Sequence, residues 1–131
     1  MSQIGHNEPP KTLEDFFIKD QNDKSTGRIK LTNTIIKKYL KPIPTEDGQG
    51  YIYQSVNDSE KIGLRCRLNP GGSIVWRYQY TPTGKLKNKK RFNTVYYTLG
   101  YFPEMSVDTA RSLVEDLKHA IKLGQDPRAV L

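Results

Sequence analysis

The segment 106–124 carries a single apolar stripe at helical spacing, and this stripe constrains the fold more than any other feature of the chain. Ser106 stands where a helix cap is expected, Asp108 lies in the first turn, and Gly124 ends the pattern shortly before Pro127. Between the two ends, apolar residues recur every three or four positions: Val107, Ala110, Leu113, Val114, Leu117, Ala120 and Ile121. An amphipathic helix of this kind can cover only one face of a small sheet.

The segments before this helix alternate with the period of two that is typical of half-buried β-strands. The alternation is clear in "GLRCRL" (63–68), "SIVWRYQYT" (73–81) and "FNTVYYTL" (92–99), and "YIYQSV" (51–56) is also rich in β-forming residues. "NPGG" (69–72) is a turn between the first two runs. One phase of the strands is apolar, and we expect it to face the helix: Leu64, Cys66, Trp76, Tyr78, Val95 and Leu99.

A shorter helical pattern lies in "LTNTIIKKYLKP" (31–42), with Thr32 or Thr34 as its cap and Pro42 as its stop. "PTEDGQG" (44–50) is expected to be a loop. The sequence therefore predicts an α+β fold, in which a three- or four-stranded antiparallel sheet packs on one C-terminal amphipathic helix and a short N-terminal helix precedes the strands.

The first part of the chain lacks a structural pattern. Residues 1–28 are polar, contain Pro9 and Pro10, and show no sustained apolar period. We therefore expect a flexible leader over 1–28 and a folded domain over 29–124.

Positive charge is concentrated in one block of the chain. Between Lys61 and Pro103 there are nine basic residues and no Asp or Glu, although the whole chain has 14 acidic residues. A block of one sign produces a sustained positive potential, which suits a polyanionic partner or an acidic membrane surface. A solubilising surface is the alternative, although such surfaces usually mix both signs.

The polar phase of the strands and the lysine-rich turn after residue 81 supply the candidate binding residues. Arg is the usual reader of guanine and Gln can read adenine in the major groove of DNA, which at about 12 Å is wide enough for a two- or three-stranded ribbon. Lysines on a turn suit phosphate contacts, because they are flexible point charges. We therefore expect double-stranded DNA as the partner, bound by Arg65, Arg67, Arg77, Gln79, Lys85, Lys87, Lys89, Lys90, Arg91, Thr94, Tyr96 and Thr98.

Other interpretations of this face remain open. A sheet face with Arg, Gln, Thr and Tyr is also an ordinary solvated face, and lysines at a sheet edge deter aggregation. Tyr and Trp on a sheet can stack single-stranded bases, which would make the chain an RNA-binding module; Trp76, however, shares its phase with the apolar residues. A protein-interaction module, docking a partner through the leader or the basic turn, is the second alternative.

The sequence offers few parts for an enzyme or a metal site. No Gly-x-Ser-x-Gly or His-Glu-x-x-His motif is present, and Cys66 is the only cysteine. His6 lies in the expected leader and His119 on the polar side of the 106–124 helix. We therefore predict no catalytic residue, no metal ligand and no cofactor. No apolar run is long enough to span a bilayer and no signal-peptide core follows Met1, so a cytoplasmic location is expected.

Five segments follow one another in the order of a known set of motifs. "LTNTIIKKYLKP" is similar to an opening Leu-Thr-Asp-x-x-Ile-Lys segment, "GLRCRL" to a Gly-Leu-x-Leu strand, and "SIVWRYQY" to a Ser-Lys-x-Trp-x-x-Arg-Tyr strand. "TLGYFPEMSVDTAR" resembles a Leu-Gly-x-Tyr-Pro-x-x-Ser-Leu-x-x-Ala-Arg junction, and "LGQDP" a closing Gly-x-Asp-Pro. Over about residues 30–128, the chain thus resembles the N-terminal arm-type DNA-binding domain of phage and genomic-island tyrosine recombinases (integrases).

The resemblance implies a three- or four-stranded antiparallel sheet backed by the long helix, with the sheet entering the major groove of short repeated arm sites that flank an attachment site. It also implies a parent tyrosine recombinase that acts in DNA integration and whose subunits meet through other domains, while the isolated domain is monomeric. The family's catalytic Arg, Lys, His-x-x-Arg and Tyr set belongs to a later domain, and "HAIK" (119–122) does not reproduce it. We accordingly expect a non-enzymatic fragment in which residues 125–131 begin a linker.

The chain departs from the family pattern in two places. The turn "TPTGKLKNKKRFN" (81–93) is longer than the family's Gly-Lys-Arg turn. The region "EDGQGYIYQSVNDSEKI" (46–62) carries extra residues before the Gly-Leu strand.

Overall fold

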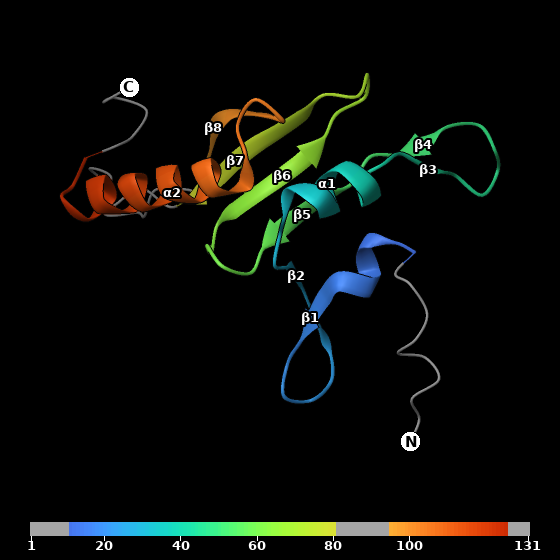
Figure 1. Ribbon diagram of the computed structural model, residues 1–131, viewed down its shortest axis with the longest axis horizontal. Coiled ribbons are helices and arrows are strands. Elements are labelled where there is room, and N and C mark those ends of the chain that lie inside the picture. Colours follow the sequence, from blue (N-terminus) through green and yellow to red (C-terminus); the bar gives the residue numbers. More distant parts are fainter. Residues whose placement is uncertain (1–10, 81–94, 126–131) are drawn as a thin grey trace, which may run out of the picture.

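The computed structural model describes residues 11–80 and 95–125, which form a six-stranded sheet, a separate two-stranded sheet and three helices (Figure 1). In chain order the elements are the 3-10 helix η2 (Leu13–Phe16), β1 (Phe17–Lys19), β2 (Ser25–Ile29), α1 (Asn33–Tyr39), β3 (Ile43–Pro44), β4 (Tyr51–Ile52), β5 (Ser55–Asp58), β6 (Leu64–Leu68), β7 (Ile74–Tyr80), β8 (Val95–Phe102) and α2 (Val107–Lys122). The α+β class and both expected α-helices are confirmed. Neither α-helix within these described ranges is long and apolar enough to cross a membrane.

The main sheet is mixed, with the strand order β1-β2-β5-β6-β7-β8. From β5 to β8 the neighbours are antiparallel, as expected, but β2 lies parallel to β5, and β1 adds a further antiparallel strand. The prediction of three or four antiparallel strands therefore describes the central part of the sheet and is wrong about its size. The parallel pair has no short turn to reveal it, because its crossover runs through α1 and the β3–β4 hairpin.

The segment 11–28 falls within the expected flexible leader, yet the structure gives it defined elements. Leu13 is only 2% exposed and belongs to the hydrophobic core. Phe16 lies against Tyr39 of α1, with ring centroids 4.9 Å apart. This segment thus packs on distant residues of the domain, which its polar composition does not indicate.

The expected strand 51–56 is divided between two sheets. Tyr51–Ile52 (β4) pairs with Ile43–Pro44 (β3) in a separate hairpin, whereas Ser55–Asp58 (β5) joins the main sheet. The turn of the hairpin spans residues 45–50, where a loop was expected, and the side chain of Thr45 donates a hydrogen bond to Asp47 at 2.6 Å. The first part of the extra region 46–62, up to Ile52, therefore belongs to a projecting hairpin (Figure 1), whereas Ser55–Asp58 in the same region belongs to the main sheet.

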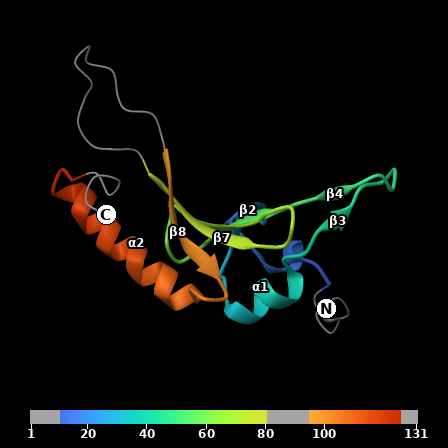
Figure 2. The same cartoon turned by 90° about the horizontal axis from the view of Figure 1, so that it is seen from above.

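Both α-helices lie on the same side of the main sheet, which leaves the opposite face of the central strands without a helix (Figure 2). On the covered side, α2 buries Val107, Ala110, Val114 and Leu117, and Leu113 is half-buried at the edge of this stripe. The expected inward phase of the sheet is confirmed: Leu64, Cys66, Trp76 and Tyr78 are buried, and Val95 and Leu99 pack against the same core.

Polar contacts fix the start of each α-helix. Thr32 caps α1 by accepting a hydrogen bond from the backbone N–H of Ile35 at 3.1 Å, and Ser106 caps α2 by accepting one from Thr109 at 3.3 Å. Trp76 is fully buried, and its Nε1 donates a hydrogen bond to the carbonyl oxygen of Met105 at 2.8 Å. This bond joins the middle of β7 to the residue that precedes the α2 cap.

Candidate nucleic-acid interface

The helix-free face of the central strands is rich in arginine and aromatic side chains. Because directly paired residues in a sheet point to the same side, the strand register places Arg65 beside Arg77 and Thr98. The next row along the strands pairs Gln79 with Tyr96. Arg67 lies opposite Val75, one row away in the other direction. We call this surface the open face and define it by Arg65, Arg67, Arg77, Gln79, Tyr96 and Thr98.

A β-bulge in β8 shapes this surface. Trp76 pairs with Gly100, whereas Arg77, the next residue, pairs with Thr98, so Leu99 is the extra residue. The bulge keeps Leu99 against the core and still presents side chains from both halves of β8 on the open face. Tyr101 is therefore exposed on this face together with Tyr96.

The three arginines of the open face have no carboxylate partner among the described residues. The ion pairs in that part of the chain use Lys19, Lys61 and Arg111. Arg65 and Arg77 are half-buried and Arg67 is exposed, so water can reach all three. Three uncompensated cations on adjacent strands produce a local positive potential suited to an anionic partner.

Tyr96 contacts two of these arginines. The Cζ atom of Arg77 is 4.7 Å from the centroid of the Tyr96 ring, and that of Arg65 is 5.5 Å away. Arg65 also donates hydrogen bonds to the hydroxyl of Tyr96 at 2.9 Å and to the hydroxyl of Ser55 at 2.7 Å. A depression of about 310 Å³ lies over this group and is lined by Tyr53, Ser55, Arg65, Arg67, Arg77 and Tyr96.

The predicted binding residues fall into two groups. Six of them lie together on the open face, from three adjacent strands: Arg65, Arg67, Arg77, Gln79, Tyr96 and Thr98. The other six lie outside the described residues, so their placement stays a prediction: Lys85, Lys87, Lys89, Lys90, Arg91 and Thr94.

Sequence reasoning missed two polar contributors to the site and its support. Ser55 anchors Arg65, but it stands in a strand whose register with β6 cannot be obtained from local patterns. Asp58, the last residue of β5, begins the turn-like segment "DSEK" (58–61), yet it is fully buried and pairs with Arg111. The residues around Asp58 in the sequence do not indicate that its carboxylate is buried, because its partner Arg111 lies in a distant segment.

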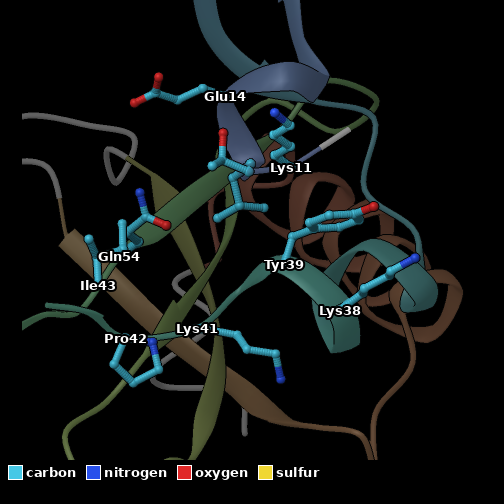
Figure 3. Close-up of a pocket in the computed structure, with 10 residues that line it drawn as sticks. Lys11, Glu14, Lys38, Tyr39, Lys41, Pro42, Ile43 and Gln54 are labelled. Atoms are coloured by element: carbon cyan, nitrogen blue, oxygen red, sulfur yellow. The ribbon is translucent and has the colours of Figure 1, made fainter. Parts of the chain in front are cut away.

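A larger hollow, of about 420 Å³, lies away from the open face, between η2, α1 and β3. Figure 3 shows Lys11 and Glu14 at one end of this hollow and Lys41 and Pro42 at the other, with Tyr39 between them. Its lining mixes an acid with lysines and apolar side chains, so it lacks the one-sign character of the open face. No group of three or more His, Cys, Asp or Glu side chains suited to a metal ion occurs in residues 11–80 and 95–125.

Comparison with known protein families assigns most of the chain to one family. Residues 31–130, which are most of the chain, match the family described as "Arm DNA-binding domain". No individual curated protein matches the sequence. The matched region includes every strand of the open face, α2, and the Trp76–Met105 junction. The chain therefore belongs to the arm-type DNA-binding domains of phage integrases.

Proposed function

We propose that this domain binds duplex DNA in a sequence-specific manner by placing the open face in the major groove. One observation carries the proposal: Arg65, Arg67 and Arg77 lie side by side on a helix-free sheet face and have no carboxylate partner among the described residues. A solubilising face would intersperse acids among these cations. Arginine is also the residue most often used to read guanine.

The dimensions of the open face suit the groove. Three neighbouring strands span about 10 Å, since strands lie about 4.8 Å apart, and the groove is about 12 Å wide. Side chains two residues apart on one strand, such as Arg77 and Gln79, are separated by about 6.8 Å. This separation corresponds to about two steps along a DNA strand.

Single-stranded RNA binding has less support. A stacking platform needs exposed aromatic faces. Tyr101 offers one on this side of the sheet, but Trp76 is buried beneath the sheet and the Tyr96 ring lies beside two guanidinium groups. The arginines therefore compete with bases for that ring.

The biological setting follows from the family. We propose that the domain is the N-terminal module of a tyrosine recombinase that acts in DNA integration and that it binds arm-type sites flanking an attachment site. Other recombinase subunits would then be reached through further domains of the parent protein, and the isolated domain would be monomeric. The six predicted contacts from Lys85 to Thr94 would add phosphate contacts beside the groove.

The test is selection of duplexes from a random library, followed by binding measurements on the preferred duplex and a scrambled one. We expect a defined consensus and tighter binding to it than to the scrambled duplex. Arg67→Ala and Arg77→Ala should each reduce the preference by about 1–3 kcal/mol. Lys118→Ala on α2, on the other side of the sheet, is the matched control and should leave both affinities unchanged. Failure to enrich any sequence, or stronger binding to single-stranded RNA, would refute the proposal.

A further inference from the structure

The two arginines beside Tyr96 are held in different ways. Both terminal nitrogens of Arg65 are engaged, one by the Tyr96 hydroxyl and the other by Ser55. Arg65 therefore connects β5 to β8 across the surface of β6 and β7. Arg77 lies closer to the Tyr96 ring, and no hydrogen bond from its guanidinium to a described residue accompanies that contact.

The hydrogen bonds of Arg65 suit a supporting role, whereas the guanidinium of Arg77 has donors available for a ligand. A guanidinium that packs against an aromatic ring keeps its N–H donors, because they lie in the guanidinium plane and point away from the stem. Arg77 thus retains its donor fork while its position is restricted by the ring of Tyr96. Arg65, in contrast, already donates hydrogen bonds to the hydroxyl oxygens of Tyr96 and Ser55.

The position of Arg77 in the sheet indicates whether its N–H donors face base edges or phosphates of the DNA. It lies on β7, the middle strand of the β6–β7–β8 ribbon, opposite Arg65 on one side and Thr98 on the other. When a ribbon enters the major groove, its central strand faces the base edges and its margins approach the phosphates. A bidentate contact to O6 and N7 of guanine is the commonest specific contact that arginine makes there.

We propose that Tyr96, braced by Arg65 and Ser55, is a positioning residue that holds Arg77 ready to read one guanine. This inference rests on the proposed duplex-DNA function and assigns the arginines unequal roles: Arg77 reads a base, and Arg65 is a support. Fixing a side chain in its bound conformation in advance is worth a factor of about 2 to 12 in affinity. The cation–π contact adds a factor of about 2 to 30 in holding that conformation.

The experiment uses the intact chain and the duplex selected above, with each guanine replaced in turn by 7-deazaguanine, which lacks the N7 acceptor. In the unmodified protein, one guanine should give a penalty of about tenfold. Tyr96→Leu should weaken binding to the selected duplex by about 2- to 30-fold and shrink the penalty at that guanine. Binding to the scrambled duplex should change by less than about twofold, since no phosphate contact is lost.

Two further variants keep the test independent of folding. Ser55→Ala removes only the far anchor of Arg65 and should reduce the same penalty to a smaller extent. Tyr101→Leu is the matched control, because Tyr101 is an exposed tyrosine of β8 on the same face and its ring makes no cation–π contact with an arginine of the described residues. It should leave the 7-deazaguanine penalty unchanged. Melting temperatures of all variants establish that they remain folded.

The outcomes separate this inference from the function on which it rests. If Tyr96→Leu weakened binding to every duplex equally and the 7-deazaguanine penalty were retained, Tyr96 would be a contact to the DNA phosphates. That result would overturn the inference. The inference would also fail if Arg77→Ala left the penalty intact while a consensus was still selected; duplex recognition would stand in both cases. Absence of any selected sequence would instead remove the proposed function itself.

Discussion

Arg111 of α2 meets the fully buried carboxylate of Asp58 through two hydrogen bonds, from Nε and Nη2, each 2.9 Å long. Asp58 also accepts hydrogen bonds from the backbone N–H groups of Leu31 and Lys61, and Arg111 donates to the carbonyl oxygen of Leu31. The pair thus joins β5, the segment before α1, and α2. The hydrogen bonds to Asp58 raise the pKa of Arg111, so this guanidinium stays charged.

We expect Asp58→Ala to lower the free energy of unfolding by about 3–5 kcal/mol, because it leaves a partly buried guanidinium without its carboxylate. Urea denaturation followed by tryptophan fluorescence measures the change. The control is Glu115→Ala, which removes an exposed partner of Lys61 and should have a much smaller effect. Equal effects of the two substitutions would show that the Asp58–Arg111 pair is not a structural anchor.

The N-terminal segment should contribute to stability. Leu13→Ala removes a side chain that is 2% exposed, and we expect a loss of about 2–5 kcal/mol. Ile18→Ala, at a position that is 41% exposed in β1, is the control and should cost less than about 1 kcal/mol. If deletion of residues 1–28 left the melting temperature unchanged, the packing of η2 on α1 would be energetically irrelevant.

Gly63 should not tolerate a side chain. Its φ is +95°, and an added Cβ would lie 2.7 Å from the carbonyl oxygen of Gln79. Gly71→Ala is a matched control, since its φ is +98° but no atom lies within 4 Å of the added carbon. Both substitutions carry backbone strain of about 1–3 kcal/mol, and Gly63→Ala should cost clearly more. Similar unfolding energies for the two variants would contradict the close approach of β7.

Cys66 should be inert in the folded protein. Burial raises the pKa of its thiol to about 12, so almost none is present as the reactive thiolate at about pH 8. We expect an aromatic disulfide reagent to label Cys66 only as fast as the domain unfolds, with rapid labelling in denaturing urea. Immediate labelling without denaturant would place Cys66 outside the core.

Salt dependence tests the electrostatic part of the proposed function. If the open face and the lysine-rich turn neutralise about five phosphates, log K against log salt should have a slope of about −4 to −5. Lys87→Ala or Lys89→Ala should make the slope shallower by about one unit. Lys122→Ala, on α2, should not change it. A slope shallower than about −2, or one that responds only to the α2 lysines, would place DNA elsewhere on the domain.

The sequence predicts the features that depend on the local spacing of apolar residues, namely α2 and the inward side of the central strands. The 106–124 stripe gives α2 and its buried face, and the alternation of Leu64, Cys66 and Trp76 gives the phase of the sheet correctly. That phase is sufficient to identify the open face. The bulge at Leu99 does not disturb it, because Val95 and Tyr97 remain in register with the core.

The remaining features depend on contacts between distant residues. Leu13 is buried by packing against the core, and Asp58 meets Arg111, which is 53 residues away in the sequence. The support of Arg65 by Ser55 and Tyr96 requires the register of three strand pairs at once. No local pattern contains this information, because each member is an ordinary polar or apolar residue in its own segment.

The hydrogen bond from Trp76 to Met105 helps to fix the direction of α2 relative to the sheet. It lies at the start of α2, close to the Ser106 cap and to the hydrogen bond between the Val107 N–H and the side chain of Asn33. The helix then runs 16 residues, or about 24 Å, away from these fixed points. A change of about 5° in its direction would displace the far end by about 2 Å. A substitution that loosens the first turn can therefore leave the open face intact and still misdirect whatever lies at the far end of the helix.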